Sequence, residues 1–318
     1  MSSFFVQGVD PFGDNVTLDQ GIMSALPPGA RIISTSRAGQ SLWVETVRIE
    51  AMLPDGSTKA YFKKGATGNV GREMVRGCYE SEKALHSFIP EYVPEPIVWG
   101  SYVSRDDMHF YLAEYVEMDD VHPDAKAWAT VASTLHRRSM GKSPEGKFGF
   151  HVGGFMANVP MSNSWSSSWE SFWAQRMRSL LEIEEARCGK DASFTGLKSA
   201  LLERVIPRYL RPLESDGRSV QPCLLHADLW PGNIKPRTDS PDILCAFDSA
   251  SFWGHFEVDL VDTGPGLWNL EKAGEAYREM VGVSEPQDEY LDRNSLYGIG
   301  GMILRSAMYN QDPKRRSM

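Results

Sequence analysis

The sequence is poor in cysteine, and its four cysteines stand far apart. Cys78, Cys188, Cys223 and Cys245 form no C-x-x-C pair, and no histidine stands near them at the spacing of a zinc site. A scaffold stapled by disulfides and a zinc-ribbon protein are therefore disfavoured, and we expect four free thiols.

Long apolar runs and an excess of basic residues are also lacking. Nowhere do about 18 apolar residues follow one another, as a membrane-spanning helix requires. Acidic residues outnumber basic ones by 42 to 33, and the net charge is −9, which makes nucleic acid a poor partner because its phosphates need a basic surface. Residues 1–4 lack the basic and apolar parts of a signal peptide. We therefore expect a cytoplasmic protein without nucleic-acid or membrane partners.

Short β-rich runs separated by turns dominate the first part of the chain. Apolar residues with a helical period of about 3.6 predict one helix over residues 71–89, before Pro90 and Pro94. Five runs with strand character surround it, and they cover residues 31–33, 42–51, 59–64, 97–103 and 109–116. We expect residues 1–116 to form a lobe made of an antiparallel sheet and a helix.

The remainder of the chain, residues 117–318, is mainly helical in pattern. Helices are predicted around residues 128–135 and 169–183, and two short apolar runs at 223–225 and 243–247 look like small strands that carry loops. The length of 318 residues suits two domains or one two-lobed domain. The predicted fold class is α+β, with a sheet lobe followed by a helical lobe.

The sharpest motif is His-Ala-Asp-Leu-Trp-Pro-Gly-Asn at residues 226–233. Asp228 precedes Asn233 by five residues, the interval of a kinase catalytic loop, and Asp248 ends an apolar run further along. Phosphoryl transfer needs a carboxylate for the acceptor hydroxyl and oxygen ligands for Mg²⁺. The spacing therefore predicts Asp228 as the base, with Asn233 and Asp248 as metal ligands. A plain turn held by side-chain hydrogen bonds is the alternative explanation of this segment.

A phosphoryl-transfer site also needs a cation for the nucleotide phosphates. Lys63 stands at the end of a predicted strand, and an acid on the following helix is its expected partner. Among the candidates Glu73, Glu80 and Glu82 we choose Glu82, because it lies on the apolar stripe of the helix, where an unpaired carboxylate is costly. The alternative is a solvated lysine at a strand end.

These residues resemble the fructosamine kinases, also called ketosamine 3-kinases. That family shares a protein-kinase-like fold with aminoglycoside phosphotransferases and choline kinases, and it carries the loop His-Gly-Asp-Leu-Trp-x-Gly-Asn, which residues 226–233 match except at Ala227. The tryptophan, Trp230, distinguishes this branch from its relatives. Further similar blocks lie at residues 135–137, 148–150, 163–173 and 250–260, so the resemblance covers roughly residues 30 to 300.

The resemblance implies transfer of the ATP γ-phosphate, with Mg²⁺, to the 3-hydroxyl of a ketosamine, which is a sugar joined to an amine of a protein or small molecule. The product then decomposes and frees the amine. In this scheme Trp230 forms the floor of the sugar pocket, and His226 and Asp259 stabilise the loop of residues 226–233. Further nucleotide contacts are expected from a loop that contains Ser36, Gly39 and Ser41, and from a hinge that contains Glu114 and Val116.

Some positions depart from the family pattern. Ala227 replaces the loop glycine, only one glycine stands in residues 34–41 where the family has a pair, and the chain diverges after residue 301. Two alternatives therefore stay open: a kinase for another small hydroxylated acceptor, such as an aminoglycoside or an amino alcohol, and a pseudokinase scaffold that binds nucleotide without turnover.

Overall fold

The computed structural model describes residues 18–38, 44–265 and 268–310. Its contacts divide the chain into two compact units. The N-terminal unit comprises Met1–Asp120 together with Pro236–Asp248, and the C-terminal unit comprises Val121–Lys235 together with Ser249–Met318. We call Pro236–Asp248 the return segment, because it brings the chain back to the first unit. From the sequence we expected a single boundary after residue 116, with no later segment that returns to the first unit.

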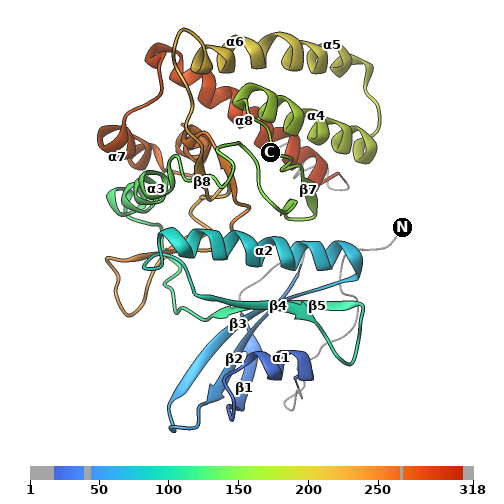
Figure 1. The fold of residues 1–318 in the computed structure, drawn as a ribbon, viewed down its shortest axis with the longest axis vertical. Helices are drawn as coiled ribbons and strands as arrows, with labels where there is room; N and C mark the ends of the chain where they lie inside the picture. The colour runs from blue at the N-terminus through green and yellow to red at the C-terminus, as the bar shows by residue number, and fades with distance from the viewer. Residues whose placement is uncertain (1–17, 39–43, 266–267, 311–318) are drawn as a thin grey trace. The chain divides into compact units, whose positions relative to one another are not determined.

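The N-terminal unit contains a five-stranded antiparallel sheet with a helix on each face (Figure 1). The strand order is β1-β2-β3-β5-β4. The elements are α1 (Gln20–Ala25), β1 (Arg31–Arg37), β2 (Glu45–Met52), β3 (Thr58–Thr67), α2 (Gly68–Phe88), β4 (Pro96–Ser101) and β5 (Met108–Glu114). The five expected strands and the helix are all present, with shifted ends.

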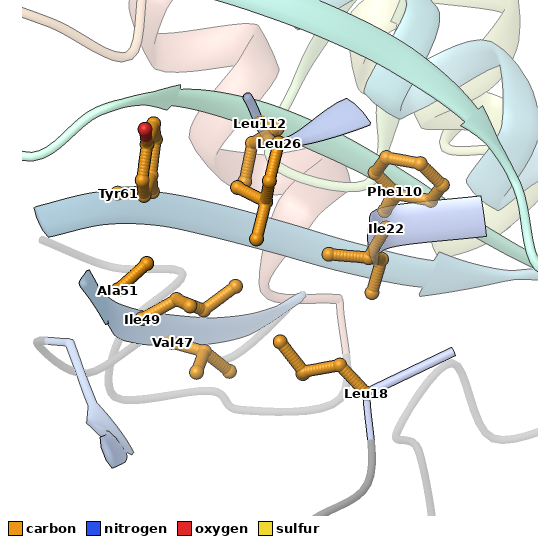
Figure 2. Close-up of a cluster of buried hydrophobic side chains, with 9 residues drawn as sticks. All are labelled: Leu18, Ile22, Leu26, Val47, Ile49, Ala51, Tyr61, Phe110 and Leu112. Carbon is orange, nitrogen blue, oxygen red and sulfur yellow. The ribbon is translucent and has the colours of Figure 1, made fainter. Parts of the chain in front are cut away.

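Alternation along the strands gives the sheet two different apolar faces. On one face, Ile22 of α1 and Leu26, which directly follows α1, lie among side chains from β2, β3 and β5, as Figure 2 shows. Tyr61 of β3 belongs to this cluster. On the other face, Ala66 of β3 and Tyr111 of β5 pack with Val75 of α2. The odd positions around Tyr61 in β3 therefore face α1, whereas the even positions up to Ala66 face α2.

The return segment is tied to the N-terminal unit by backbone hydrogen bonds. Near its start, Thr238 donates its N–H to the carbonyl of Glu117 over 3.0 Å. Near its end, Ala246 donates to the carbonyl of Tyr92 over 2.7 Å. It contains β10 (Leu244–Ala246), and β9 (Ile234–Pro236) leads into it.

The C-terminal unit is mainly helical and contains small two-stranded pairs, β6 with β7 and β8 with β11. Its helices pack around aromatic side chains: Trp169 of α4 is fully buried and donates its indole N–H to the hydroxyl of Tyr297 of α8 over 2.8 Å. The main elements are α3 (Ala125–Ser139), β6 (Gly154–Met156), β7 (Val159–Met161), α4 (Trp169–Cys188), α5 (Ala192–Ala200), α6 (Ile206–Leu210), β8 (Cys223–Leu225), β11 (Phe252–Gly254), a 3₁₀ helix (Phe256–Thr263), α7 (Glu271–Val281) and α8 (Tyr290–Met308). None of the helices in the described part of the chain has both the length and the apolar character needed to cross a membrane.

Candidate active site

Lys64 in β3 carries a buried ammonium group in the N-terminal unit. Only 7% of the residue is exposed, and its Nζ lies 2.5 Å from Oδ1 of Asp248 and 3.5 Å from Sγ of Cys78 on α2. Burial alone would lower the pKa of Lys64, but the charge of Asp248, with contributions from Cys78 and Glu82, raises the pKa above its ordinary value. Lys64 is therefore held as a cation.

Lys63 points to the other face of the sheet. Its Nζ donates to Oε2 of Glu45 over 2.6 Å and to the hydroxyl of Tyr102 over 2.8 Å. The expectation that Lys63 faces Glu82 is wrong, because neighbouring residues of a strand point to opposite faces and α2 covers only the face of Lys64. Glu82 is buried on α2, with 3% exposed, and the lysine whose pKa it raises is Lys64.

Asp248 follows β10 at the end of the return segment. Its backbone is left-handed, with φ of 58°, a conformation that aspartate tolerates better than most residues. The Asp248 side chain is 53% exposed although it is paired with Lys64. A carboxylate with this exposure can still accept a cation.

The predicted catalytic loop, residues 226–233, lies in the C-terminal unit between β8 and β9. Asn233 donates its side-chain N–H to Oδ2 of Asp228 over 2.7 Å and to the Asp228 carbonyl over 3.0 Å. A turn closed by the Asn233 N–H and the Trp230 carbonyl, 2.9 Å apart, supports this contact. The five-residue interval thus brings the two predicted side chains together.

Asp259 braces the start of the loop, as expected. Its carboxylate accepts the N–H of His226 over 2.9 Å and that of Ala227 over 2.7 Å, and His136 approaches it to 3.0 Å. Burial would raise the pKa of Asp259, but the hydrogen bond and the charge of His136 lower it below its ordinary value. The buried carboxylate therefore stays ionised and fixes the backbone that precedes Asp228.

The backbone on either side of Asp228 has two further features. Ala227 has φ of 66°, which explains why the resembling family has glycine here, since glycine has no Cβ penalty in this conformation. Beyond Asp228, the buried indole of Trp128 on α3 donates to the carbonyl of Leu229 over 3.1 Å. The loop is held on both sides of Asp228.

Trp230 lies over the loop and beside a second tryptophan. A Cβ built on Gly232 would lie 2.2 Å from the Trp230 ring, so glycine is required for this ring position. The ring centroid of Trp268 is 4.8 Å from that of Trp230, with an angle of 41° between the planes. The sequence reasoning missed Trp268, because only the folded backbone brings it to the loop.

The remaining predicted residues lie in the N-terminal part of the chain. Ser36 is exposed on β1, opposite Arg48 of β2. Glu114 ends β5 and donates its N–H to the carbonyl of Glu95 over 2.8 Å, and Val116 is buried. Gly39 and Ser41 lie outside the described residues. The nucleotide-binding role of all these residues stays a prediction.

The fold is shared with known phosphotransferase structures. A putative fructosamine-3-kinase from Haemophilus somnus superimposes with a TM-score of 0.68 at 18% identity, over 90% of this chain and 88% of that one. A thermostable mutant of an aminoglycoside phosphotransferase gives a TM-score of 0.60 at 10% identity, over 90% and 91% of the two chains. The predicted kinase-like α+β fold is confirmed.

The sequence comparisons define the family within that fold. The fructosamine kinase family model matches residues 37–315, and the chain belongs to this family of phosphotransferases. A chloroplastic protein-ribulosamine 3-kinase of Oryza sativa subsp. indica is 28% identical over 240 residues, which are 75% of this chain and 64% of that protein. A ketosamine-3-kinase of Mus musculus is 38% identical over 119 residues, 37% of this chain and 35% of that protein. The match therefore spans less than two thirds of the length of these relatives.

Proposed function

We propose that this protein transfers the γ-phosphate of ATP to the 3-hydroxyl of a ketosamine. The observation that carries the proposal is the hydrogen bond from Asn233 to Asp228 in a loop that Asp259 braces. A carboxylate held in one orientation suits a group that must accept the proton of an attacking hydroxyl.

In the proposed reaction, the acceptor hydroxyl gives its proton to the carboxylate of Asp228. Its oxygen forms a bond to the γ-phosphorus, the bond between that phosphorus and the bridging oxygen breaks, and ADP leaves with the electron pair. Because little covalent chemistry is required of the protein, the rate depends on positioning and on charge stabilisation.

Oxygen donors from two residues suit a magnesium ion. Asn233 directs its side-chain nitrogen to Asp228, which leaves its oxygen as the donor for a cation, and Asp248 presents a half-exposed carboxylate. Such hard oxygen donors, combined with phosphate oxygens, are the ligands that Mg²⁺ prefers. A magnesium ion held by such donors would neutralise charge on the phosphates.

We assign the phosphate-binding role to Lys64 in place of Lys63. The ammonium of Lys64 already neutralises one anion, the carboxylate of Asp248, and its pKa is raised, so it stays charged at neutral pH. Lys63 is engaged by Glu45 and Tyr102 on the other face of the sheet.

The substrate class is supported by the family and by Trp230. Similar proteins are named protein-ribulosamine 3-kinase and ketosamine-3-kinase, and a half-buried indole can cover the C–H face of a sugar. Phosphorylation at the 3-hydroxyl makes the ketosamine decompose and releases the amine, so deglycation is the proposed purpose. The cytoplasmic location expected from the sequence stays a prediction.

The test is Mg²⁺-dependent ATP consumption with ribulose-lysine and fructose-lysine, beside free sugars and aminoglycosides. We expect turnover on the ketosamines and a loss of about 10²- to 10⁴-fold in kcat for Asp228→Asn. Asp216→Asn, which changes an exposed aspartate in a turn of the same unit, is the matched control and should keep native activity. Turnover on aminoglycosides alone would contradict the substrate class, and ATP binding without any turnover would favour a pseudokinase.

A further inference from the structure

Trp230 and Trp268 form an open aromatic wedge in the C-terminal unit. Their ring centroids are 4.8 Å apart and their planes meet at 41°, so the rings diverge instead of stacking face to face. Trp230 follows Asp228 by two residues. The wedge therefore begins on the loop that carries the proposed base.

The exposure of the two rings distinguishes them from the tryptophans of the core. Trp128 and Trp169 are fully buried, whereas Trp230 and Trp268 are only half-buried. Large aromatic side chains with one enclosed and one accessible side are typical of binding surfaces. Core packing alone does not account for a wedge in which both residues stay partly exposed.

Both rings are held in place by contacts of their own. Trp230 lies against Gly232, where no Cβ fits. Trp268 donates its indole N–H to Oδ1 of Asp262 over 3.2 Å, and its carbonyl oxygen lies 2.8 Å from Nε2 of His122. A preorganised pair of rings loses little freedom when a ligand binds.

The chemistry of the wedge favours an organic cation with apolar C–H groups. The face of an indole attracts an ammonium group through its quadrupole and covers C–H groups through dispersion. Asp262 stands behind Trp268; burial raises the pKa of Asp262 to about 6, while the charge of Arg305 acts in the other direction. At neutral pH the carboxylate form predominates, which increases the electron density offered by the indole that donates to it.

Building on the proposed function, we propose that the wedge is the subsite for the linking amine of the ketosamine. Trp230 covers the sugar, Trp268 contacts the secondary ammonium and its neighbouring methylene groups, and Asp262 is a positioning residue for the Trp268 ring. Such a subsite would distinguish a ketosamine from a free sugar, which has no ammonium group. Trp268 would thereby determine specificity without taking part in phosphoryl transfer.

The test compares Trp268→Ala and Trp268→Phe with the native protein, using fructose-lysine and an analogue whose linking nitrogen is acylated and uncharged. For Trp268→Ala we expect the KM for fructose-lysine to rise about tenfold, the size of a cation–π contact, with kcat and the KM for ATP within twofold of native. Trp268→Phe should recover most of the loss. The analogue keeps the methylene groups but carries no ammonium, so Trp268→Ala should weaken its binding clearly less than it weakens the binding of fructose-lysine.

Two further variants separate a specific role from a structural one. Asp262→Asn retains an oxygen that accepts the indole N–H but lacks the charge, and should recover part of the rise in KM that Asp262→Ala causes. Trp99→Ala, which removes a half-buried tryptophan of β4, is the matched control and should leave the acceptor KM unchanged.

The outcomes distinguish this inference from the function on which it rests. A native protein that phosphorylates no ketosamine contradicts the proposed function and removes the basis for the subsite. Native turnover on ketosamines together with an unchanged KM in Trp268→Ala overturns the subsite alone. An equal loss for fructose-lysine and the uncharged analogue also overturns it, because the contact would then not involve the ammonium.

Discussion

Lys64 and Asp248 are 184 positions apart in the chain, yet Nζ of the one lies 2.5 Å from Oδ1 of the other. The return segment makes this ion pair possible, because it ends at Asp248 within the same compact unit as β3. The carboxylate of Asp248 offsets the cost of burying the ammonium of Lys64. In the proposed function this pair would join two groups that phosphoryl transfer requires, a cation for the phosphates and a carboxylate for the metal.

Lys64 and Lys63 provide a matched pair of variants on neighbouring positions. We expect Lys64→Ala to lower kcat/KM by about 100-fold or more, because it removes the charge that we propose to bind the phosphates. Lys63→Ala should keep kcat within about fivefold. It should instead lower stability, because it leaves the largely buried carboxylate of Glu45 without its cation. Steady-state kinetics and thermal unfolding of both variants check this. A larger kinetic loss for Lys63→Ala would restore the assignment made from the sequence.

Asn233 is expected to set the requirement for magnesium. Asn233→Ala removes an oxygen donor and the hydrogen bond to Asp228, so the Mg²⁺ concentration for half-maximal activity should rise about 10- to 100-fold. Activity measured against Mg²⁺ at saturating ATP gives the value. Asn69→Ala, at an exposed position of α2, is the control. An unchanged Mg²⁺ requirement in Asn233→Ala would mean that this residue only orients Asp228.

Ala227 is strained, and glycine should relieve the strain. Because φ at Ala227 is 66°, Ala227→Gly removes a Cβ penalty and should raise the free energy of unfolding by up to about 1 kcal/mol, after the greater freedom of glycine in the unfolded chain is subtracted. Chemical denaturation measures it. Ala84→Gly in α2 should instead lower stability by about 1 kcal/mol. Destabilisation of the same size in both variants would rule out strain at Ala227.

His255 is expected to make the protein sensitive to mild acid. Its ring nitrogens lie 2.8 Å from the hydroxyls of Tyr297 and Ser284, and burial lowers the pKa of His255 from 6.5 to about 4. Between these pH values the unfolded chain binds a proton that the folded chain does not bind. The free energy of unfolding should therefore fall as the pH drops from 6.5 to 4, by up to about 1.4 kcal/mol per pH unit.

Denaturation at a series of pH values checks this behaviour. His255→Gln removes the titrating group, so its stability should depend less on pH across that window, even if the variant is less stable at pH 7. Equal slopes for the variant and the native protein would show that other groups cause the acid sensitivity.

The sequence predicted most of the fold because apolar periodicity and turn residues are local signals. The helix expected at residues 71–89 is α2 (Gly68–Phe88), and the strand expected at 223–225 is β8. The short helix α1 was missed, because its six residues are too few to show a period. The return segment was missed as well, since the unit to which a strand belongs depends on contacts far away in the chain.

The candidate site was predictable where spacing fixes geometry. Asp228 and Asn233 meet because a single turn joins them. The choice between Lys63 and Lys64 depended on the register of β3, and a shift of one residue moves a side chain to the other face of the sheet. Trp268 could not be placed from the sequence, because its contact with Trp230 depends on the folded backbone.

The return segment also has a consequence for the order of events during synthesis. A ribosome makes the strands of the N-terminal sheet first, and then Val121–Lys235, before the residue that pairs with Lys64 is made. Lys64 is thus made long before its carboxylate partner. The N-terminal unit is complete only when residue 248 has been made, so no N-terminal fragment that stops before Asp248 contains all of it.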